Sequence, residues 1–390
     1  MILRHVFADR NGNGSQWGLS KALRQFSGTE SRTAHNRTLN GNANSLGAGR
    51  ERKSCHYTES PLRHMAMAAE RSLWDIKLAH RPKSFWYPYQ TLQNVGVLER
   101  LLAGPGLDLV QLCRGPHGKI ADIGAADGDL AFFLEKMGLS VHLIDNERTN
   151  FNRFEGARIL QEALHSTVRI RTVDLDSQFT LSGEKYDAIF LLGLLYHLKN
   201  PFFVLEKLSR MARYCFLSTR VARQTADGLP LSKYPVAYLL GPGECNNDST
   251  NFWIFSEEAL KRLIDRTGWS ILAYTAIGDT QHSTPADPNH DERIFCVLQS
   301  NAVTELCASP NPVPVGERIG RTTIQWNTAN ASPGKVYVSV NGQEESLFAS
   351  GCQGTATANW IQAGASYEFR LYDSDRTRLL DKISVTTAVE

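Results

Sequence analysis

The segment Ala121-Asp-Ile-Gly-Ala-Ala-Asp-Gly-Asp129 carries the strongest structural signal in this chain, because it joins an apolar strand to a helix through a turn of small residues. Residues 119–123 are expected to form the strand and residues 130–137 the helix. Gly124 and Gly128 allow a ligand to approach the backbone closely. The first turn of the helix adds unpaired N–H groups and a partial positive charge. A turn of this kind can also be purely structural, so the surrounding segments must supply further support.

Downstream of this turn, strand-like and helix-like patterns alternate as far as residue 299. Strands are expected at residues 141–145, 168–173, 186–192, 214–219, 269–274 and 294–298, and helices at residues 151–164, 202–211 and 256–267. Regular alternation of this kind indicates a mostly parallel sheet with helices on both faces. We therefore predict an α/β fold with a Rossmann-like, doubly wound sheet of seven strands, interrupted by one long loop at 220–255.

The segments before and after this sheet have different sequence patterns and composition. Short alternating runs after residue 317, with a hairpin signal at Asn341-Gly342, are typical of a small all-β sandwich of immunoglobulin or fibronectin type. The chain thus divides into a disordered tail at 1–56, a helical segment at 57–103, the α/β domain at 104–300, a proline-containing linker at 301–316 and the β-sandwich at 317–390. The tail is rich in polar residues and glycine and cannot bury enough apolar surface to fold, although a nucleic-acid-binding arm is the alternative.

Composition excludes several classes of protein. The 390 residues are 42% apolar and 21% charged, which is ordinary for a globular protein. The longest apolar run, residues 188–196, is too short to span a membrane. Residues 1–56 hold nine Lys or Arg against three Asp or Glu, and since the whole chain carries +2, the remainder carries −4 and has no charge suited to DNA. The seven scattered cysteines favour neither a disulfide framework nor a zinc site, so we expect a cytoplasmic protein without a metal.

Three further features fall at the carboxyl ends of expected strands, where a doubly wound sheet places its ligand crevice. Asp145 ends the second strand and can accept hydrogen bonds from both ribose hydroxyls of a nucleoside. Asp174 and Leu175 follow the third strand and suit an adenine amino group with an apolar wall beside it. Gly193 ends the fourth strand, which is strongly apolar. Together with the glycine turn, these positions predict a cofactor that contains a nucleoside.

On these residues the sequence resembles the class I S-adenosylmethionine (SAM) methyltransferases, over roughly residues 85–300. The resemblance implies that SAM is the cofactor and that residues 104–300 form the SAM-binding domain. It assigns cofactor contacts to Asp122, Gly124, Ala126, Gly128, Asp145, Asp174, Leu175 and Gly193. Ala126 stands where the family usually has its middle glycine. An NAD-binding Rossmann enzyme shares the glycine loop and the acid after the second strand, but Asp174 and the fourth strand fit SAM better.

Residues 192–201, Leu-Gly-Leu-Leu-Tyr-His-Leu-Lys-Asn-Pro, and residues 85–89, Phe-Trp-Tyr-Pro-Tyr, are similar to one branch of that family. This branch contains the tRNA wobble-uridine carboxymethyl-transferring enzyme, which uses carboxy-SAM. The resemblance implies tRNA as a candidate partner. The body of the chain shows no basic surface for RNA, and no Arg or Lys is assigned to the extra carboxylate. We therefore expect this chain to share the fold of the branch, and we do not assign its substrate to this chain.

Tyr196 and His197 follow the fourth strand at the lip of the expected crevice and are the candidate catalytic residues. His197 can deprotonate a hydroxyl or amine as the methyl group moves, because histidine side chains titrate near neutral pH. Alternatively, His197 caps a helix or supports the loop. Tyr196 either covers the adenosine or packs in the core.

The acceptor pocket is expected between the loop at 238–255 and the aromatic turn at 85–89. The candidate acceptor contacts in the loop are Glu244, Asn246, Asn247 and Asp248. The alternative is a polar turn that covers the edge of the sheet. Trp86 and Tyr87 either form the opposite wall or anchor the N-terminal helices. Trp326 and Trp360 are expected in the core of the sandwich.

Three functions follow from these features. The first is a SAM-dependent methyltransferase that acts on a small-molecule or RNA nucleophile by in-line displacement. The second is carboxymethyl transfer from carboxy-SAM to tRNA, which predicts RNA binding that weakens steeply with salt. The third is a non-catalytic scaffold of the same fold, which presents the sandwich to a protein or glycan partner. The intact glycine loop, Asp145 and Asp174 favour the first function over the third.

Overall fold

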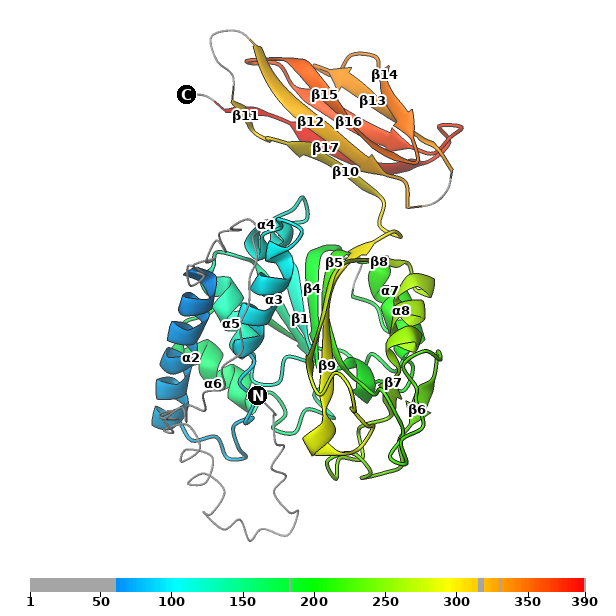
Figure 1. Cartoon of the computed structure of the whole chain (residues 1–390). Helices are drawn as coiled ribbons and strands as arrows, with labels where there is room; N and C mark the ends of the chain where they lie inside the picture. Colours follow the sequence, from blue (N-terminus) through cyan, green and yellow to red (C-terminus); the bar gives the residue numbers. More distant parts are fainter. Residues whose placement is uncertain (1–60, 182–183, 315–318, 330–331, 389–390) are drawn as a thin grey trace, which may run out of the picture.

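The computed structural model describes residues 61–388, with the exception of 182–183, 315–318 and 330–331. It contains a large α/β unit followed by a smaller all-β unit (Figure 1). The expected tail at 1–56 lies outside the described residues. Among the residues that are described, no helix combines the length and the apolar character needed to cross a membrane.

The α/β unit is built on one sheet in which β3, β2, β1, β4 and β5 are parallel neighbours, and β9 and β8 follow antiparallel beyond β5. These strands are β1 (Ile120–Ile123), β2 (Val141–Asp145), β3 (Arg169–Thr172), β4 (Tyr186–Leu192), β5 (Ala212–Val221), β8 (Trp269–Gly278) and β9 (Glu292–Ser300). Two short strands, β6 (Ala237–Leu239) and β7 (Trp253–Phe255), extend the sheet from the end of β5. The sheet therefore has nine strands rather than the predicted seven, because part of the long loop at 220–255 pairs with it.

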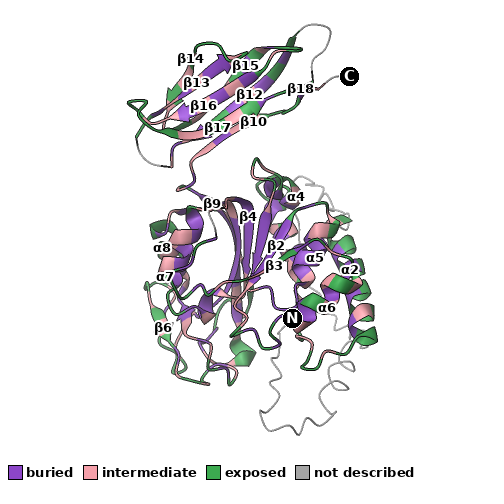
Figure 2. Cartoon of the chain, turned by 180° about the vertical axis from the view of Figure 1, so that it is seen from behind, coloured by how far each residue is buried: buried purple, intermediate pink, exposed green. Residues whose placement is uncertain are grey.

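Helices cover both faces of the sheet, as predicted (Figure 2). One face carries α2 (Pro61–Ala79), α3 (Gln93–Ala103), α4 (Leu109–Cys113), α5 (Asp129–Lys136) and α6 (Glu155–Ala163), and the other carries α7 (Pro201–Ser209) and α8 (Glu257–Arg266). Alternate residues of β4 enter the two cores, so that Phe190 packs on one face and Ile189 and Leu191 on the other. Ser256 caps α8 as predicted, because its Oγ accepts a hydrogen bond from the N–H of Ala259.

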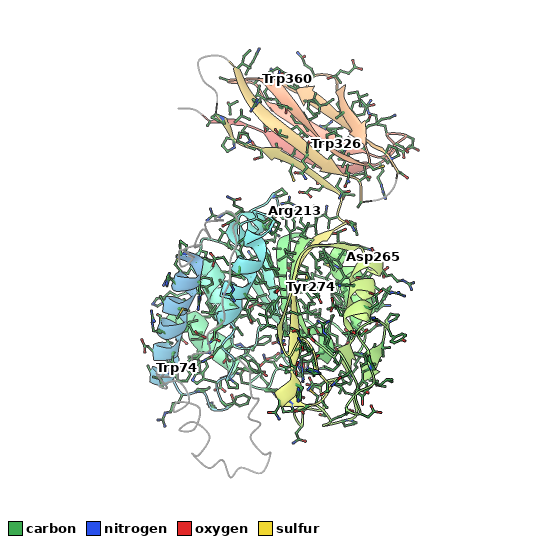
Figure 3. The ribbon with its side chains drawn as sticks, viewed as in Figure 1. Trp74, Arg213, Asp265, Tyr274, Trp326 and Trp360 are labelled. Atoms are coloured by element: carbon green, nitrogen blue, oxygen red, sulfur yellow. The ribbon has the colours of Figure 1, made fainter. Side chains whose placement is uncertain are left out.

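The C-terminal unit is a β-sandwich with a core of its own. One sheet has the order β10-β12-β15 and the other β14-β13-β16-β17, while β11 pairs with β18. The bounds are β10 (Glu305–Ser309), β11 (Val313–Pro314), β12 (Ile319–Asn327), β13 (Gly334–Val340), β14 (Ser346–Gly351), β15 (Gln353–Gln362), β16 (Tyr367–Tyr372), β17 (Leu379–Val385) and β18 (Thr387–Ala388). Trp326 is buried in the shared core and Trp360 packs against it (Figure 3).

The structure corrects the predicted linker at 301–316. Both β10 and β11 fall within this segment and pair with β12 and β18. Leu306 and Val313 are buried in the sandwich core, so the flanks of the proline-rich stretch belong to the sandwich.

An ion pair joins the two units at the amino ends of the parallel strands (Figure 3). Arg213, the second residue of β5, pairs with Glu305 at the start of β10. Arg213 Nη1 also lies 3.7 Å from Oδ1 of Asp187, which is fully buried. Since ligand crevices in such sheets lie at the carboxyl ends of the strands, the sandwich is attached at the opposite edge.

Candidate active site

A cavity of about 430 Å³ lies at the carboxyl ends of β1, β2 and β4. Ten of the predicted site residues line it: Tyr87, Gly124, Ala126, Asp145, Asp174, Leu175, Gly193, Tyr196, His197 and Asp248. Six others do not line it: Trp86, Asp122, Gly128, Glu244, Asn246 and Asn247. The contacts of these residues explain the difference.

The glycine turn bends at three residues with positive φ, namely Gly124 (76°), Ala126 (53°) and Gly128 (84°). A Cβ at Gly124 would lie 2.9 Å from Leu194, and one at Gly128 would lie 2.4 Å from Leu143, so neither position has room for a side chain. Gly128 is the N-cap of α5 and does not line the cavity. Ala126 keeps the left-handed conformation at a small steric cost.

Asp122 is buried below this turn and supports it. The pKa of its carboxyl is raised to about 7, mainly by burial and also by the nearby charge of Asp145, and a hydrogen bond from the backbone of Ala131 opposes this shift. Ala131 lies in the first turns of α5. Asp122, a predicted cofactor contact, thus lies outside the cavity lining and is hydrogen-bonded to the helix that follows the turn.

Asp145 is fixed at the end of β2 by three hydrogen bonds. Its Oδ2 accepts from the N–H of Ala126 and from Nδ2 of Asn150, both at 3.1 Å, and its Oδ1 accepts from the N–H of Asn146 at 2.7 Å. Burial raises the pKa of this carboxyl, and the hydrogen bonds oppose that shift. A carboxylate accepts about four hydrogen bonds, so this group can still receive one from a ribose hydroxyl.

The predicted adenine contacts, Asp174 and Leu175, follow β3 and lie in the cavity wall. Leu175 is buried and lines the cavity, and Asp174 lines it from an exposed position. Asp174 Oδ1 accepts from the N–H of Asp176 at 3.1 Å, which leaves its other oxygen for a ligand amino group.

The N-terminal helical segment holds the glycine turn in place. Lys77 of α2 is buried, and its Nζ lies 3.5 Å from Asp127 and 2.8 Å from Asp129. Asp127 also accepts from the N–H of Tyr87 (2.8 Å) and from Nδ2 of Asn152 (2.7 Å). Burial raises the pKa of Asp127 to about 6, while Lys77 acts in the opposite direction. Lys77 and Asp127 are 50 residues apart, and no local sequence signal indicates their contact.

In the aromatic turn at 85–89, some side chains line the cavity and one anchors the turn to α2. Tyr87 and Tyr89 line the cavity, and the ring of Tyr87 stacks on Phe151 with 6.0 Å between ring centres. Trp86 instead donates its indole N–H to two backbone carbonyls at the end of α2. Trp86 therefore anchors the turn, which was the alternative to an acceptor wall.

His197 lies in the 3-10 turn η1 (Leu195–His197) at the cavity wall. Its Nδ1 is 3.1 Å from the carbonyl oxygen of Thr250 and 3.0 Å from the Oγ1 of the same residue. Because a carbonyl only accepts, Nδ1 carries a proton, and Nε2 is the ring nitrogen that accepts a proton when the ring is neutral. The hydroxyl of Thr250 donates to Oδ1 of Asp248 at 2.6 Å. Asp248 therefore orients His197 through Thr250.

The other three predicted acceptor contacts in the loop at 238–255 build the loop itself. Glu244 accepts from a tyrosine hydroxyl and from a backbone N–H within the loop. Asn246 and Asn247 have φ values of 54° and 52°, the left-handed conformation that Asn tolerates in turns. The polar-turn alternative thus describes these residues. Polar composition alone did not separate residues that shape a turn from residues that face a ligand.

Tyr196 and Arg293 form the part of the wall next to Gly193. Arg293 Nη2 lies 3.4 Å from the hydroxyl of Tyr196, and a Cβ at Gly193 would lie 3.2 Å from Arg293 Nη1. Sequence reasoning missed Arg293. Since β9 runs antiparallel to β5, its first residues reach the same edge as the last residues of β5. A charged residue before the apolar run at 294–298 was the available signal.

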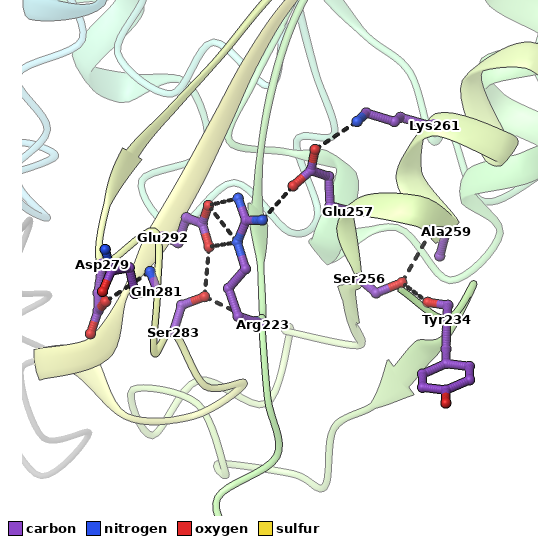
Figure 4. A network of polar contacts seen from close by, with 10 residues as sticks. All are labelled: Arg223, Tyr234, Ser256, Glu257, Ala259, Lys261, Asp279, Gln281, Ser283 and Glu292. Carbon is purple, nitrogen blue, oxygen red and sulfur yellow. Dashed lines mark hydrogen bonds and ion pairs between the residues drawn. The ribbon is translucent and has the colours of Figure 1, made fainter. Parts of the chain in front are cut away.

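A network of ion pairs fixes the start of β9 (Figure 4). Glu292 is fully buried and accepts from Nε and Nη2 of Arg223, at 2.6 to 3.1 Å, and from Oγ of Ser283 at 2.6 Å. Arg223 also pairs with Glu257 at the start of α8. Adjacent residues of a strand point to opposite faces, so this anchor also fixes the direction of Arg293.

Residues 98–274, rather less than half of the chain, match the family model described as a methyltransferase domain. Among solved structures, the N-terminal domain of EvdMO1 with SAH bound is 16% identical, with a TM-score of 0.37 over 60% of this chain and 96% of that one. The PH0226 protein from Pyrococcus horikoshii OT3 is 12% identical, with a TM-score of 0.36 over 53% of this chain and 92% of that one. A putative methyltransferase from Bacillus halodurans C-125 is 12% identical, with a TM-score of 0.37 over 49% and 96%. No curated protein matches the chain significantly.

The family match agrees with the cavity, in which a turn with two glycines at crowded positions, a fixed acid at Asp145 and the Asp174–Leu175 pair fit SAM. Within the described ranges, no group of three or more His, Cys, Asp or Glu is arranged to hold a metal ion. Residues 98–274 therefore carry a SAM-dependent methyltransferase domain, and S-adenosyl-L-methionine is its cofactor.

Proposed function

We propose that this domain transfers the methyl group of SAM to a hydroxyl or amine of a small molecule, with His197 as the general base. The observation that carries the proposal is the chain of contacts from Asp248 through Thr250 to His197, which fixes one tautomer of the base at the cavity wall. When bound, SAM supplies an electrophilic methyl group. His197 takes the proton of the acceptor as the new bond forms, while Asp145 and the glycine turn hold the nucleoside side of the cofactor.

The charges around the cavity favour a small molecule over RNA. Its lining contains four carboxylates and two cations, namely Asp145, Asp174, Asp176 and Asp248 against Lys199 and Arg293. Such a surface repels a polyanionic backbone, whereas it complements the positive sulfonium of SAM.

Carboxymethyl transfer from carboxy-SAM to tRNA is the second candidate. Arg293 is the observation that favours it, because a cation in the cavity wall can pair with an extra carboxylate on the cofactor. The acidic lining counts against the RNA part of this candidate.

The two candidates are separated by supplying the full chain with methyl-labelled SAM together with either a small-molecule extract or total tRNA. The proposal predicts label in the small-molecule fraction and its loss in His197→Gln. Label in tRNA alone, or small-molecule labelling that His197→Gln leaves unchanged, contradicts it.

The position of the sandwich bears on its own role. It joins the α/β unit at Arg213, at the edge opposite the cavity, which supports a role away from the chemistry. Contact with a protein or a glycan through the sandwich stays a prediction, as does a cytoplasmic location.

A further inference from the structure

Arg293 is a cation in the cavity wall that lacks a counter-ion among the described residues. The hydroxyl of Tyr196, at 3.4 Å, accepts from its Nη2, and the guanidinium carbon lies 5.6 Å from the centre of the same ring. Within the described part of the chain, no Asp or Glu oxygen comes within 4.0 Å of an Arg293 nitrogen. Arginine keeps its charge at any physiological pH, so the charge cannot be removed by deprotonation.

Two carboxylates near the cavity, Asp291 and Asp248, already have partners. Asp291 pairs with Nε of Arg220, a buried residue that lies directly opposite Arg293 in the β5–β9 register. Asp248 accepts two hydrogen bonds from Thr250 through Oδ1. Arg220 and Arg293 thus occupy paired positions on neighbouring strands, and the carboxylate of Asp291 forms its ion pair with Arg220 rather than with Arg293.

A guanidinium withdrawn from water without an anion is costly, and the cost falls when a ligand supplies the anion. Arg293 has five N–H donors in a planar fork, of which Tyr196 accepts one. A carboxylate or a phosphate can accept two of the others in parallel, and the pairing is strong in a partly dehydrated cavity.

We propose that Arg293 and Tyr196 bind an anionic group, a carboxylate or a phosphate, of the acceptor substrate. This inference rests on the proposed function and adds the chemical class of the acceptor, a small anionic molecule. Its nucleophile lies close to the anionic group, since the ring centres of Tyr196 and His197 are 4.4 Å apart. The acidic groups elsewhere in the lining restrict the site to a molecule with one such group rather than a polyanion.

The test uses the full chain saturated with S-adenosylhomocysteine (SAH) and calorimetric titration with benzoate, phenyl phosphate and the neutral analogue benzamide. The wild type is expected to bind one of the anions at least about tenfold more tightly than benzamide. Arg293→Met should abolish this preference while the affinity for SAH stays unchanged. Lys199→Met is the matched control, because it removes an exposed cation of the same lining and should keep the preference. Arg293→Lys, which keeps the charge without the planar fork, should retain part of it.

Three results distinguish a failure of this inference from a failure of the proposed function. Equal affinity for the anions and benzamide in the wild type, which needs no variant to fold, overturns the inference, as does a preference that survives Arg293→Met. If Arg293→Met instead weakens only carboxy-SAM relative to SAM, the anion belongs to the cofactor and the inference about the acceptor falls. Failure of the wild type to bind SAH, measured before any anion is added, would overturn the proposed function itself.

Discussion

Nδ1 of His197 lies 3.0 Å from the Oγ1 of Thr250, and this hydroxyl donates to Asp248 at 2.6 Å. The contact links two segments that are 53 residues apart, the turn after β4 and the loop before β7. A second contact, from the N–H of Phe252 to the carbonyl of Tyr196 at 2.9 Å, holds the same two segments together. The loop therefore contributes to the orientation of the candidate base, although much of it only shapes turns.

Thr250→Val should slow methyl transfer without weakening cofactor binding. The change removes the hydroxyl but keeps the carbonyl, so the ring loses one of two groups that hold its Nδ1. We expect kcat to fall about tenfold, and by about a hundredfold or more in His197→Gln, because general-base catalysis contributes that much. Initial rates over a pH series, with SAH affinity as the control, measure the effect. A Thr250→Val enzyme with the kcat and pH profile of the wild type would rule out this positioning role.

Lys77→Met should weaken SAH binding, although Lys77 does not line the cavity. The change leaves Asp127 buried without its cation, which typically costs about 3 kcal/mol, and it loosens the glycine turn. Urea unfolding and SAH titration measure the two effects. The double variant Lys77→Met/Asp127→Asn removes both charges and should recover much of the stability. Strictly additive losses in this double-mutant cycle would show that the pair is not coupled.

The raised pKa of the Asp122 carboxyl should make the stability of the protein depend on pH. Its pKa in the folded protein, about 7, lies above the ordinary value of 3.8, so the native state binds more protons than the unfolded state between these values. The free energy of unfolding should therefore fall as the pH rises through this range, by up to about 1.4 kcal/mol per pH unit from this group. Asp122→Asn should flatten the dependence and be more stable than the wild type above pH 7. Denaturant unfolding at several pH values measures this, with the exposed Asp265→Asn as the control. Parallel curves for wild type and Asp122→Asn would refute the account.

Arg213→Met should destabilise the protein without changing the affinity for SAH. Asp187 is fully buried, and losing its nearest cation is expected to cost about 3 kcal/mol. The cavity lies at the opposite edge of the sheet, so the cofactor should not sense the change. Thermal unfolding and SAH titration measure the two quantities. A clear loss of SAH affinity in a folded variant would show that the two edges are coupled.

The fold was predictable where one continuous segment carries a clear hydrophobic pattern over several residues. Residues 186–192 form β4 with the predicted bounds, because a buried parallel strand is apolar throughout. The strands β6 and β7 have three residues each and carry no periodic signal, so residues 220–255 were predicted as one long loop. The prolines at 310–314 concealed β10 and β11, which belong to the sandwich through buried residues on either side.

The site was predictable on its cofactor side and much less so on its acceptor side. Asp145 and Asp174 follow strands directly, and the carboxyl ends of parallel strands meet at one edge. Lys77, Thr250 and Arg293 act through contacts between segments that are distant in the sequence. Their roles depend on how helices, loops and an antiparallel strand pack, which no local pattern encodes.

The central claim, that the cavity at the ends of β1, β2 and β4 binds the cofactor through Asp145, is tested most directly by calorimetric titration with SAH. The wild type is expected to bind in the micromolar range, and Asp145→Ala at least about a hundredfold more weakly, with its cooperative unfolding retained. Absence of binding to a folded wild type shown to be free of bound ligand, or an Asp145→Ala variant that binds like the wild type, would contradict the claim.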